Sequence, residues 1–175
     1  NYGDGNSINF GKLNGIVAIF GKNNSGKSSV IDSVLYTVFN STSKNERKNL
    51  NIINQNKEEG SGTVEIAIGN KTYTIARSSE KYIKKYQGNE SIEAKTDIDF
   101  SCYDEVTQET TSLNGLTRNE TDKNIRKVFG SLDDFLISSM SSQLDALSFL
   151  KEGSTKRKEI FAKFLDLEIF EKKYR

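Results

Sequence analysis

The sequence of 175 residues contains no histidine, and this absence excludes several kinds of chemistry. Without an imidazole, the chain alone has no Ser-His-Asp triad, no histidine general base and no histidine metal ligand. Cysteine is nearly absent as well. The single Cys102 has no partner for an internal disulfide or a cysteine-rich zinc site, and it suits a reducing compartment. We therefore expect a cytoplasmic protein without those sites.

The chain also lacks an excess of charge and a long apolar run. Its 25 Lys and Arg residues nearly balance 24 Asp and Glu residues, so contact with DNA would require a local basic patch. No segment approaches the roughly 18 apolar residues of a membrane span, and no charged-then-apolar leader opens the chain. These features predict a soluble protein of one domain without a membrane partner.

The first forty residues predict strands, a glycine-rich loop and a helix. Ile8 and Phe10 alternate with polar neighbours, as in a half-buried strand. Residues 16–20 form a continuous apolar run rich in β-branched side chains, which favours a central strand buried on both faces. After the loop, apolar residues recur at helical spacing from Val30 to Val38.

The loop between the run and the helix has the pattern Gly-x-x-x-x-Gly-Lys-Ser, from Gly21 to Ser28. Such a loop points main-chain N–H groups at phosphates, and the helix dipole adds to the attraction. Lys27 supplies a positive charge for the β and γ phosphates, and the Ser28 hydroxyl suits Mg²⁺. We predict a site for ATP and Mg²⁺, whereas the simpler interpretation is a glycine-rich turn capping an ordinary helix. The predicted nucleotide-binding residues are Asn23, Asn24, Ser25, Gly26, Lys27, Ser28 and Ser29.

The rest of the chain predicts an antiparallel meander followed by helices. A polar loop over 40–62 precedes a hairpin of residues 63–68 and 71–76, with further strands at 82–86 and 98–103. A helix ends at Gly130, and Ser131 and Asp134 resemble a capping box for the next one. Ser154 is expected to cap another helix, and a further helix is expected to begin in 167–175 and to continue beyond the charged run 171–175.

Two groups of charged residues have competing interpretations. Asp104 and Glu105 follow a strand as a metal-binding acidic pair would, but their strand is polar at Ser101, and an antiparallel strand running into a turn is the simpler explanation. Lys81, Lys84 and Lys85 lie among tyrosines and are the best local candidates for a DNA backbone contact. A solvated strand face is the competing explanation for these lysines.

Several segments together resemble the N-terminal half of SMC-like ATPases, and most of all the SbcC type that repairs DNA double-strand breaks. The segments that carry the resemblance are Tyr2-Gly3-Asp4-Gly5, the phosphate loop with residues 29–35, Leu113-Asn114-Gly115, Phe135-Leu136, Ser138-Ser139-Met140-Ser141-Ser142-Gln143, and 149–158. The likeness spans nearly the whole chain. It implies an α/β fold, the P-loop NTPase first lobe of an ABC/SMC-like head, with an antiparallel β meander and C-terminal helices leading to a coiled coil.

The resemblance also implies a function and a set of partners. Such a head is assembled from two distant segments, and the second segment carries the signature motif and the acidic pair. Gln143 matches the glutamine that touches Mg²⁺ and the attacking water, so Lys27 and Gln143 are the catalytic candidates, and Ser28 and Gln143 the metal ligands. The implied partners are the C-terminal half of the ATPase, a second head joined through ATP, a Mn²⁺-dependent nuclease and double-stranded DNA. The location would then be DNA-associated, in the nucleoid or the nucleus.

On this basis we expect one half-head made of four parts. Residues 1–40 hold the strand, loop and helix, 41–105 the polar loop and meander, 106–166 a helical segment with Gln143, and 167–175 the start of the coiled coil. This segment alone is expected to be inactive as an ATPase.

Two other functions remain open at the level of sequence. A self-contained P-loop GTPase or kinase is disfavoured, because no aspartate is followed three positions later by glycine. The stretch Asn56-Lys57-Glu58-Glu59 also departs from the guanine-reading Asn-Lys-x-Asp pattern. The other alternative is a scaffold that binds nucleotide without hydrolysing it.

Overall fold

A computed structural model gives the fold, and the structure describes residues 9–23, 25–42, 52–86, 89–138, 153–155, 157, 158 and 162. The helices and strands in chain order are η1 (Phe10–Lys12), α1 (Lys27–Phe39), β1 (Glu59–Ile68), β2 (Lys71–Tyr86), β3 (Asn89–Asp104), β4 (Glu109–Ser112), α2 (Arg118–Phe129) and α3 (Leu132–Ser138). They fall into two compact units, residues 1–129 and 130–175. Within the described ranges, no helix combines the length and the apolar character needed to cross a membrane.

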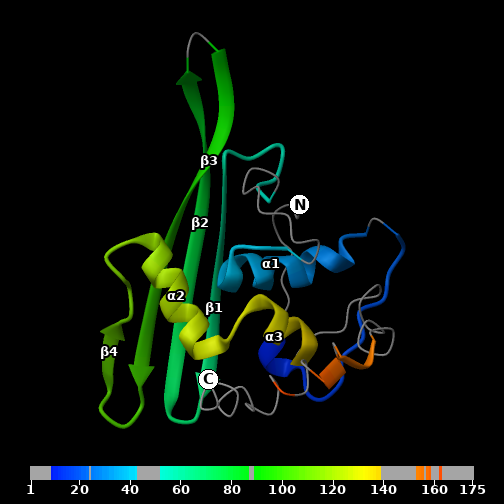
Figure 1. The fold of residues 1–175 in the computed structure, drawn as a ribbon, viewed down its shortest axis with the longest axis vertical. Coiled ribbons are helices and arrows are strands. Elements are labelled where there is room, and N and C mark those ends of the chain that lie inside the picture. Colours follow the sequence, from blue (N-terminus) through cyan, green and yellow to red (C-terminus); the bar gives the residue numbers. More distant parts are fainter. Residues whose placement is uncertain are drawn as a thin grey trace. The chain divides into compact units, whose positions relative to one another are not determined.

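The first unit is built on a four-stranded antiparallel sheet in the order β1-β2-β3-β4 (Figure 1). Gly69 and Asn70 connect β1 to β2, and Gly69 has a φ of 60°, which a residue without Cβ adopts at little cost. β3 turns into β4 through residues 105–108. The predicted hairpin and meander are therefore confirmed, with longer strands than the sequence indicated.

β2 and β3 extend well beyond the other strands as a two-stranded arm (Figure 1). β1 pairs with β2 only as far as Glu80, and residues 81–86 continue the same strand opposite 89–94 of β3. The segment 82–86, predicted as a strand, is thus the outer end of β2. Ile83 and Ile92 pair directly across the arm, and both are exposed.

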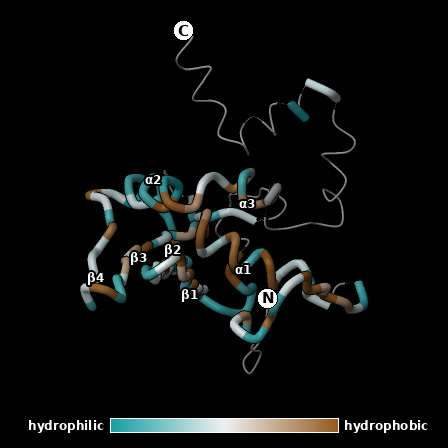
Figure 2. Tube along the Cα trace, turned by 90° about the horizontal axis from the view of Figure 1, so that it is seen from below, coloured by the Kyte–Doolittle hydropathy of each residue, from teal (hydrophilic) through white to brown (hydrophobic). Residues whose placement is uncertain are grey.

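Two helices cover one face of the sheet. α1 packs against β1 and β2, α2 packs against β3, and the helices also contact each other. The core lies beneath them, and the hydrophobic colour in Figure 2 gathers along α1. Its buried apolar side chains are Val30, Leu35, Tyr36, Val38, Phe39, Ile53, Ile75, Phe100, Cys102 and Ile125. Phe129 meets Tyr73 edge-on and also touches Phe100, so α2 is held by an aromatic cluster.

Buried polar side chains also face the helices along β2 and β3. The Tyr36 hydroxyl hydrogen-bonds with Ser79 Oγ at 2.7 Å, and Ser79 Oγ hydrogen-bonds with Thr96 Oγ1 at 2.7 Å. Arg77, 1% exposed, lies on the same face of β2 between Ile75 and Ser79. Since buried polar groups are costly unless they are hydrogen-bonded, this row fixes how α1 lies on the sheet.

The second unit confirms the predicted capping box. Gly130, with a φ of 77°, follows the last residue of α2. The Ser131 N–H donates to Asp134 Oδ2 at 2.8 Å, and the Asp134 N–H donates to Ser131 Oγ at 3.3 Å, at the start of α3. The expected cap at Ser154 is wrong. Ser154 is already helical, and the Arg157 N–H donates to the carbonyl of Gly153.

Two predicted strands near the N-terminus are not found. Phe10 begins the short helix η1, and residues 16–20 belong to no strand. Ile16 is fully exposed at 104% and Phe20 is 90% exposed, instead of buried on both faces. The physical reason is that a strand exists only through hydrogen bonds to a neighbouring strand, whereas an apolar run indicates only a tendency to be buried. The one sheet in the described ranges is antiparallel and does not include this segment.

Candidate functional site

The glycine-rich loop leads directly into the first turn of α1. Gly26 is the N-cap and has a left-handed backbone with a φ of 86°, and Lys27 is the first helical residue. Within the described residues, no side chain caps this helix start. The first N–H groups of a helix lack the i−4 partners of later turns, and the positive end of the helix dipole favours an anion at this position. The predicted helix after the loop is confirmed, and phosphate binding by the loop stays a prediction.

Lys27 folds back into the loop. Its Nζ donates to the carbonyl oxygen of Gly21 at 2.6 Å and to that of Lys22 at 2.7 Å. The loop is also closed by the Ser25 N–H, which donates to the Lys22 carbonyl at 3.2 Å. The ammonium group thus lies inside the curve of the backbone, where it can exchange carbonyl partners for phosphate oxygens.

The loop has no room for a side chain at its first glycine. A Cβ at Gly21 would lie 2.7 Å from Ser25 Oγ and 3.5 Å from two side-chain carbons of Lys27. Ser28, exposed on the first turn of α1, presents a hydroxyl, the kind of oxygen ligand that Mg²⁺ accepts. An ammonium, main-chain N–H groups and a hydroxyl fit a polyphosphate with Mg²⁺. Of the predicted nucleotide-binding residues, Asn24 lies outside the described residues.

The remaining parts of a hydrolytic site are not found in the described part of the chain. It contains no group of three or more His, Cys, Asp or Glu residues that would hold a metal ion. Asp104 closes the β3–β4 turn instead, because its Oδ1 accepts the N–H groups of Val106 and Thr107. The antiparallel-strand interpretation of Asp104 and Glu105 is therefore correct. Gln143 lies outside the described residues, so its predicted contact with Mg²⁺ and water stays a prediction.

The three candidate DNA-binding lysines do not form one basic patch. Lys81 Nζ donates to three main-chain carbonyls in the turn before β1: Asn54 at 3.2 Å, Gln55 at 3.3 Å and Lys57 at 2.6 Å. Lys81 therefore stabilises that turn. Lys84 pairs with Glu93 at 2.9 Å and Lys85 with Glu90 at 2.8 Å. Because side chains alternate along a strand, Lys84 projects from the opposite face of the arm to Lys81 and Lys85. This geometry favours the solvated-face interpretation.

The Lys84 pair belongs to a small surface network. The hydrogen bond from Lys84 is the main cause that lowers the pKa of the Glu93 carboxyl, and the Tyr82 hydroxyl adds to it. The same hydrogen bond raises the pKa of Lys84. Both groups therefore stay charged over a wide pH range, and each offsets the field of the other at the arm surface.

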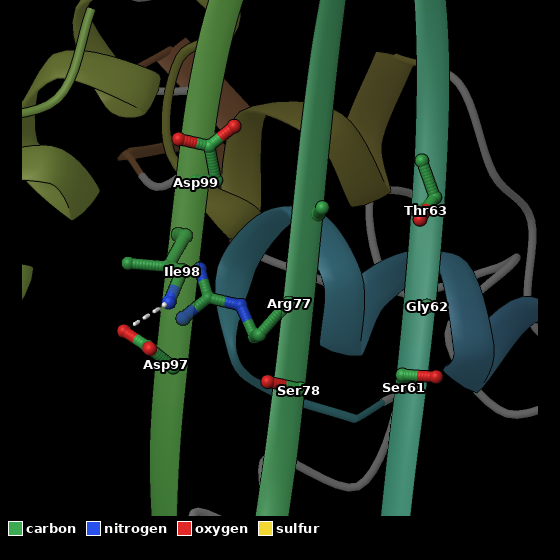
Figure 3. Close-up of a pocket in the computed structure, with 9 residues that line it drawn as sticks. Ser61, Gly62, Thr63, Arg77, Ser78, Asp97, Ile98 and Asp99 are labelled. Carbon is green, nitrogen blue, oxygen red and sulfur yellow. Dashed lines mark hydrogen bonds between the residues drawn. The ribbon is translucent and has the colours of Figure 1, made fainter.

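The face of the sheet away from the helices carries a shallow depression of about 350 Å³ (Figure 3). Six of the residues that line it are Ser61, Thr63, Ala76, Ser78, Asp97 and Asp99. The charged groups that line the depression on this face are the carboxylates of Asp97 and Asp99. Arg77 also belongs to the lining, but its side chain is buried on the other face, under α1. A depression with this charge repels phosphates, so it is not the nucleotide site.

Sequence reasoning did not identify Arg77 and Asp122, which form a buried ion pair. Arg77 Nη2 lies 2.6 Å from Asp122 Oδ1, and the Arg77 side chain is fully buried. Arg77 Nε also donates to the carbonyl of Thr37 at 3.0 Å, and Nη2 to that of Val38 at 3.4 Å. The available signal was positional, since Arg77 occupies an inward position of β2 between Ile75 and Ser79, where a charged residue is unusual.

The loop, its helix and the antiparallel sheet define a P-loop nucleotide-binding domain. The chain belongs to the AAA domain family, whose model matches residues 1–175. It is an AAA-type P-loop domain of the SMC/Rad50 kind, with an antiparallel sheet and few helices. Such domains are in general ATPases that bind nucleotide with Mg²⁺.

The chain is similar to two curated relatives, one of which is a Rad50 ATPase. An uncharacterized protein of Acanthamoeba polyphaga mimivirus is 31% identical over 175 residues, which cover 97% of this chain and 12% of that protein. The DNA double-strand break repair Rad50 ATPase of Sulfolobus acidocaldarius is 36% identical over 63 residues, which cover 36% of this chain and 7% of that protein. The chain thus spans a small fraction of the length of both relatives.

Proposed function

We propose that this chain is the ATP-binding part of the head of a DNA double-strand-break repair ATPase. The observation that carries the proposal is the position of Lys27, whose ammonium lies within the glycine-rich loop at the start of α1. The archaeal relative is a double-strand break repair ATPase, and this supports the particular role. ATP and Mg²⁺ bind at the loop, with Ser28 and Gln143 as metal ligands.

The proposed head is completed by a second segment. In this proposal the second segment supplies the acidic metal ligands and covers the apolar run 16–20, which is exposed in this chain. ATP then joins two completed heads, and hydrolysis releases them. This cycle regulates DNA binding and a Mn²⁺-dependent nuclease. The proposed location is the cytoplasm, in association with DNA.

A substitution of Lys27 tests the nucleotide site. We expect Lys27→Ala to weaken binding of a fluorescent ATP analogue with Mg²⁺ by about tenfold to a hundredfold, since a charge-assisted hydrogen bond to phosphate is lost. The Nζ contacts only loop carbonyls, so the circular dichroism spectrum and the unfolding midpoint should change little. Titration of both proteins with the analogue measures the effect.

Lys12→Ala is the matched control, because Lys12 lies in η1 outside the phosphate loop. It removes an equal charge from the same region and should bind the analogue as the unsubstituted chain does. Equal affinity in the Lys27→Ala and control proteins would show that the loop does not hold nucleotide. Rapid GTP hydrolysis by this chain would instead favour the self-contained GTPase.

A further inference from the structure

Arg77 connects three elements at the end of α1 that lies far from the phosphate loop. Its guanidinium group belongs to β2, binds the carbonyls of Thr37 and Val38 in the last turn of α1, and pairs with Asp122 of α2. In Figure 3, Arg77 lies between Gly62 of β1 and Ile98 of β3, with α1 behind the strands. A positive group is favourable here, because the C-terminal end of a helix carries partial negative charge.

The anchorage of α1 is concentrated at this end. The buried residues of α1 are Val30 and the consecutive run 35–39. At the start of the helix, Lys27 is half-buried and Ser28 is exposed. Ten residues separate Lys27 from Thr37, a length of about 15 Å at 1.5 Å per residue. A small change of angle at the anchored end therefore moves the phosphate loop by a larger distance.

Apolar contacts alone would leave this angle loosely defined, because hydrophobic burial has no preferred direction. A guanidinium is planar and presents its donors in a fixed fork, so its hydrogen bonds define an orientation. Here the fork is shared between backbone carbonyls of α1 and a carboxylate of α2. The direction of α1 thus depends on where α2 holds Asp122.

We infer that Arg77 is the positioning residue that sets the direction of α1, and with it the geometry of the phosphate loop. Asp122 makes that geometry depend on the position of α2. A displacement of α2 changes nucleotide affinity through this ion pair, without any contact between α2 and nucleotide. The inference rests on the proposed nucleotide site, but its structural half can be measured without nucleotide.

Arg77→Met and Asp122→Asn are the test variants, studied in the full chain. Met keeps an unbranched apolar stem and removes every donor, whereas Asn keeps an acceptor and removes the charge. Lys71→Met is the matched control, because Lys71 lies on β2 as Arg77 does and forms only a loose pair, at 4.0 Å, with Asp104 of β3. All proteins are compared at a temperature where circular dichroism shows them fully folded.

The first measurement is hydrogen exchange of the α1 amides without nucleotide. We expect Arg77→Met to speed exchange in α1 by about tenfold, while amides shared by β2 and β3 exchange as before. Asp122→Asn should produce a smaller change in the same direction, and the control none. Unchanged α1 exchange in a folded Arg77→Met protein would overturn the inference, whatever the nucleotide site does. Should Arg77→Met fail to fold, Asp122→Asn gives the deciding comparison.

The second measurement is the dissociation constant of a fluorescent ATP analogue with Mg²⁺. We expect it to rise about tenfold in Arg77→Met and by a smaller factor in Asp122→Asn. A purely structural role would lower the unfolding midpoint and leave affinity in the folded protein unchanged, which would overturn the inference. If the unsubstituted chain binds no nucleotide, the proposed function fails, and hydrogen exchange still decides whether Arg77 positions α1.

Discussion

At the scale of single residues, the structure contains a tyrosine whose ionisation is linked to folding. Tyr36 on α1 is 4% exposed, and its hydroxyl hydrogen-bonds with Ser79. Burial raises the pKa of the Tyr36 phenol, and the Ser79 hydrogen bond and the Arg77 charge offset part of this rise. The folded state therefore favours the neutral phenol, which contributes to stability as long as the unfolded chain is also protonated.

The pH dependence follows from the direction of this shift. Below about pH 10 the phenol is neutral in both states, and its contribution is fully present. Above that pH the unfolded chain loses the proton first, so the free energy of unfolding falls as pH rises. We expect Tyr36→Phe to reduce the steepness of this fall, although it also costs about 1 kcal/mol at neutral pH through the lost hydrogen bond. Urea denaturation between neutral pH and pH 11 measures both effects.

Tyr103→Phe provides the comparison, because Tyr103 lies 39% exposed on β3 and so measures the removal of a surface phenol. A Tyr36→Phe protein with the alkaline slope of the unsubstituted chain would contradict the linkage of Tyr36 ionisation to folding.

The burial of Arg77 is a feature at the residue scale that the sequence could not predict. Composition rules place arginine at the surface, whereas Arg77 is buried by partners from α1 and α2 that lie about forty positions away.

At the scale of elements, α1 and β1 lie in close contact at Gly62. A Cβ at Gly62 would overlap the Thr37 hydroxyl, which itself donates to the Ser33 carbonyl at 2.8 Å. We expect Gly62→Ala to lower the free energy of unfolding by about 1 to 3 kcal/mol, because either the helix or the strand must shift. Equilibrium urea denaturation gives this quantity.

Two companion variants isolate the cause of that loss. Gly60→Ala lies two residues earlier in β1, where the nearest atom to the new Cβ is 3.7 Å away, so it should have little effect. Thr37→Ala removes the overlapping oxygen, so Gly62→Ala should cost less in that background. If Gly62→Ala destabilises both backgrounds equally, the close contact with Thr37 is not the reason.

Elements that depend on neighbouring residues were predictable, and elements that depend on distant partners were not. The helix α1 after the glycine-rich loop, the Gly69-Asn70 hairpin and the Ser131–Asp134 capping box are each encoded within a few residues, and all three are confirmed. The segment 16–20 was wrongly predicted as a central strand, because an apolar run indicates a tendency to be buried and does not specify hydrogen bonds to a neighbouring strand. At the site, sequence predicted Lys27 and the loop, but not the carbonyls that hold its ammonium group.

At the scale of the whole molecule, two observations support the proposed second segment of the head. The apolar run 16–20 is exposed, and this chain aligns with only a small part of each relative. Ile16, Val17, Ile19 and Phe20 are each exposed by 45% or more in the described structure. The aligned region makes up only 12% and 7% of the two relatives. Since soluble proteins rarely leave contiguous apolar surface unused, we take this run as the contact for the proposed second segment of the head.

This argument predicts that a substitution at Ile16 separates stability from activity. Ile16 is fully exposed, so Ile16→Ser should change the free energy of unfolding of this chain by less than about 0.5 kcal/mol. When the second segment is present, the same substitution should lower the rate of ATP hydrolysis by about tenfold, because the apolar contact that completes the head is weakened. Ile92→Ser, at another exposed isoleucine on the outer arm, should leave both quantities unchanged. Equal hydrolysis rates in the Ile16→Ser and Ile92→Ser proteins would mean that the run does not join the two segments.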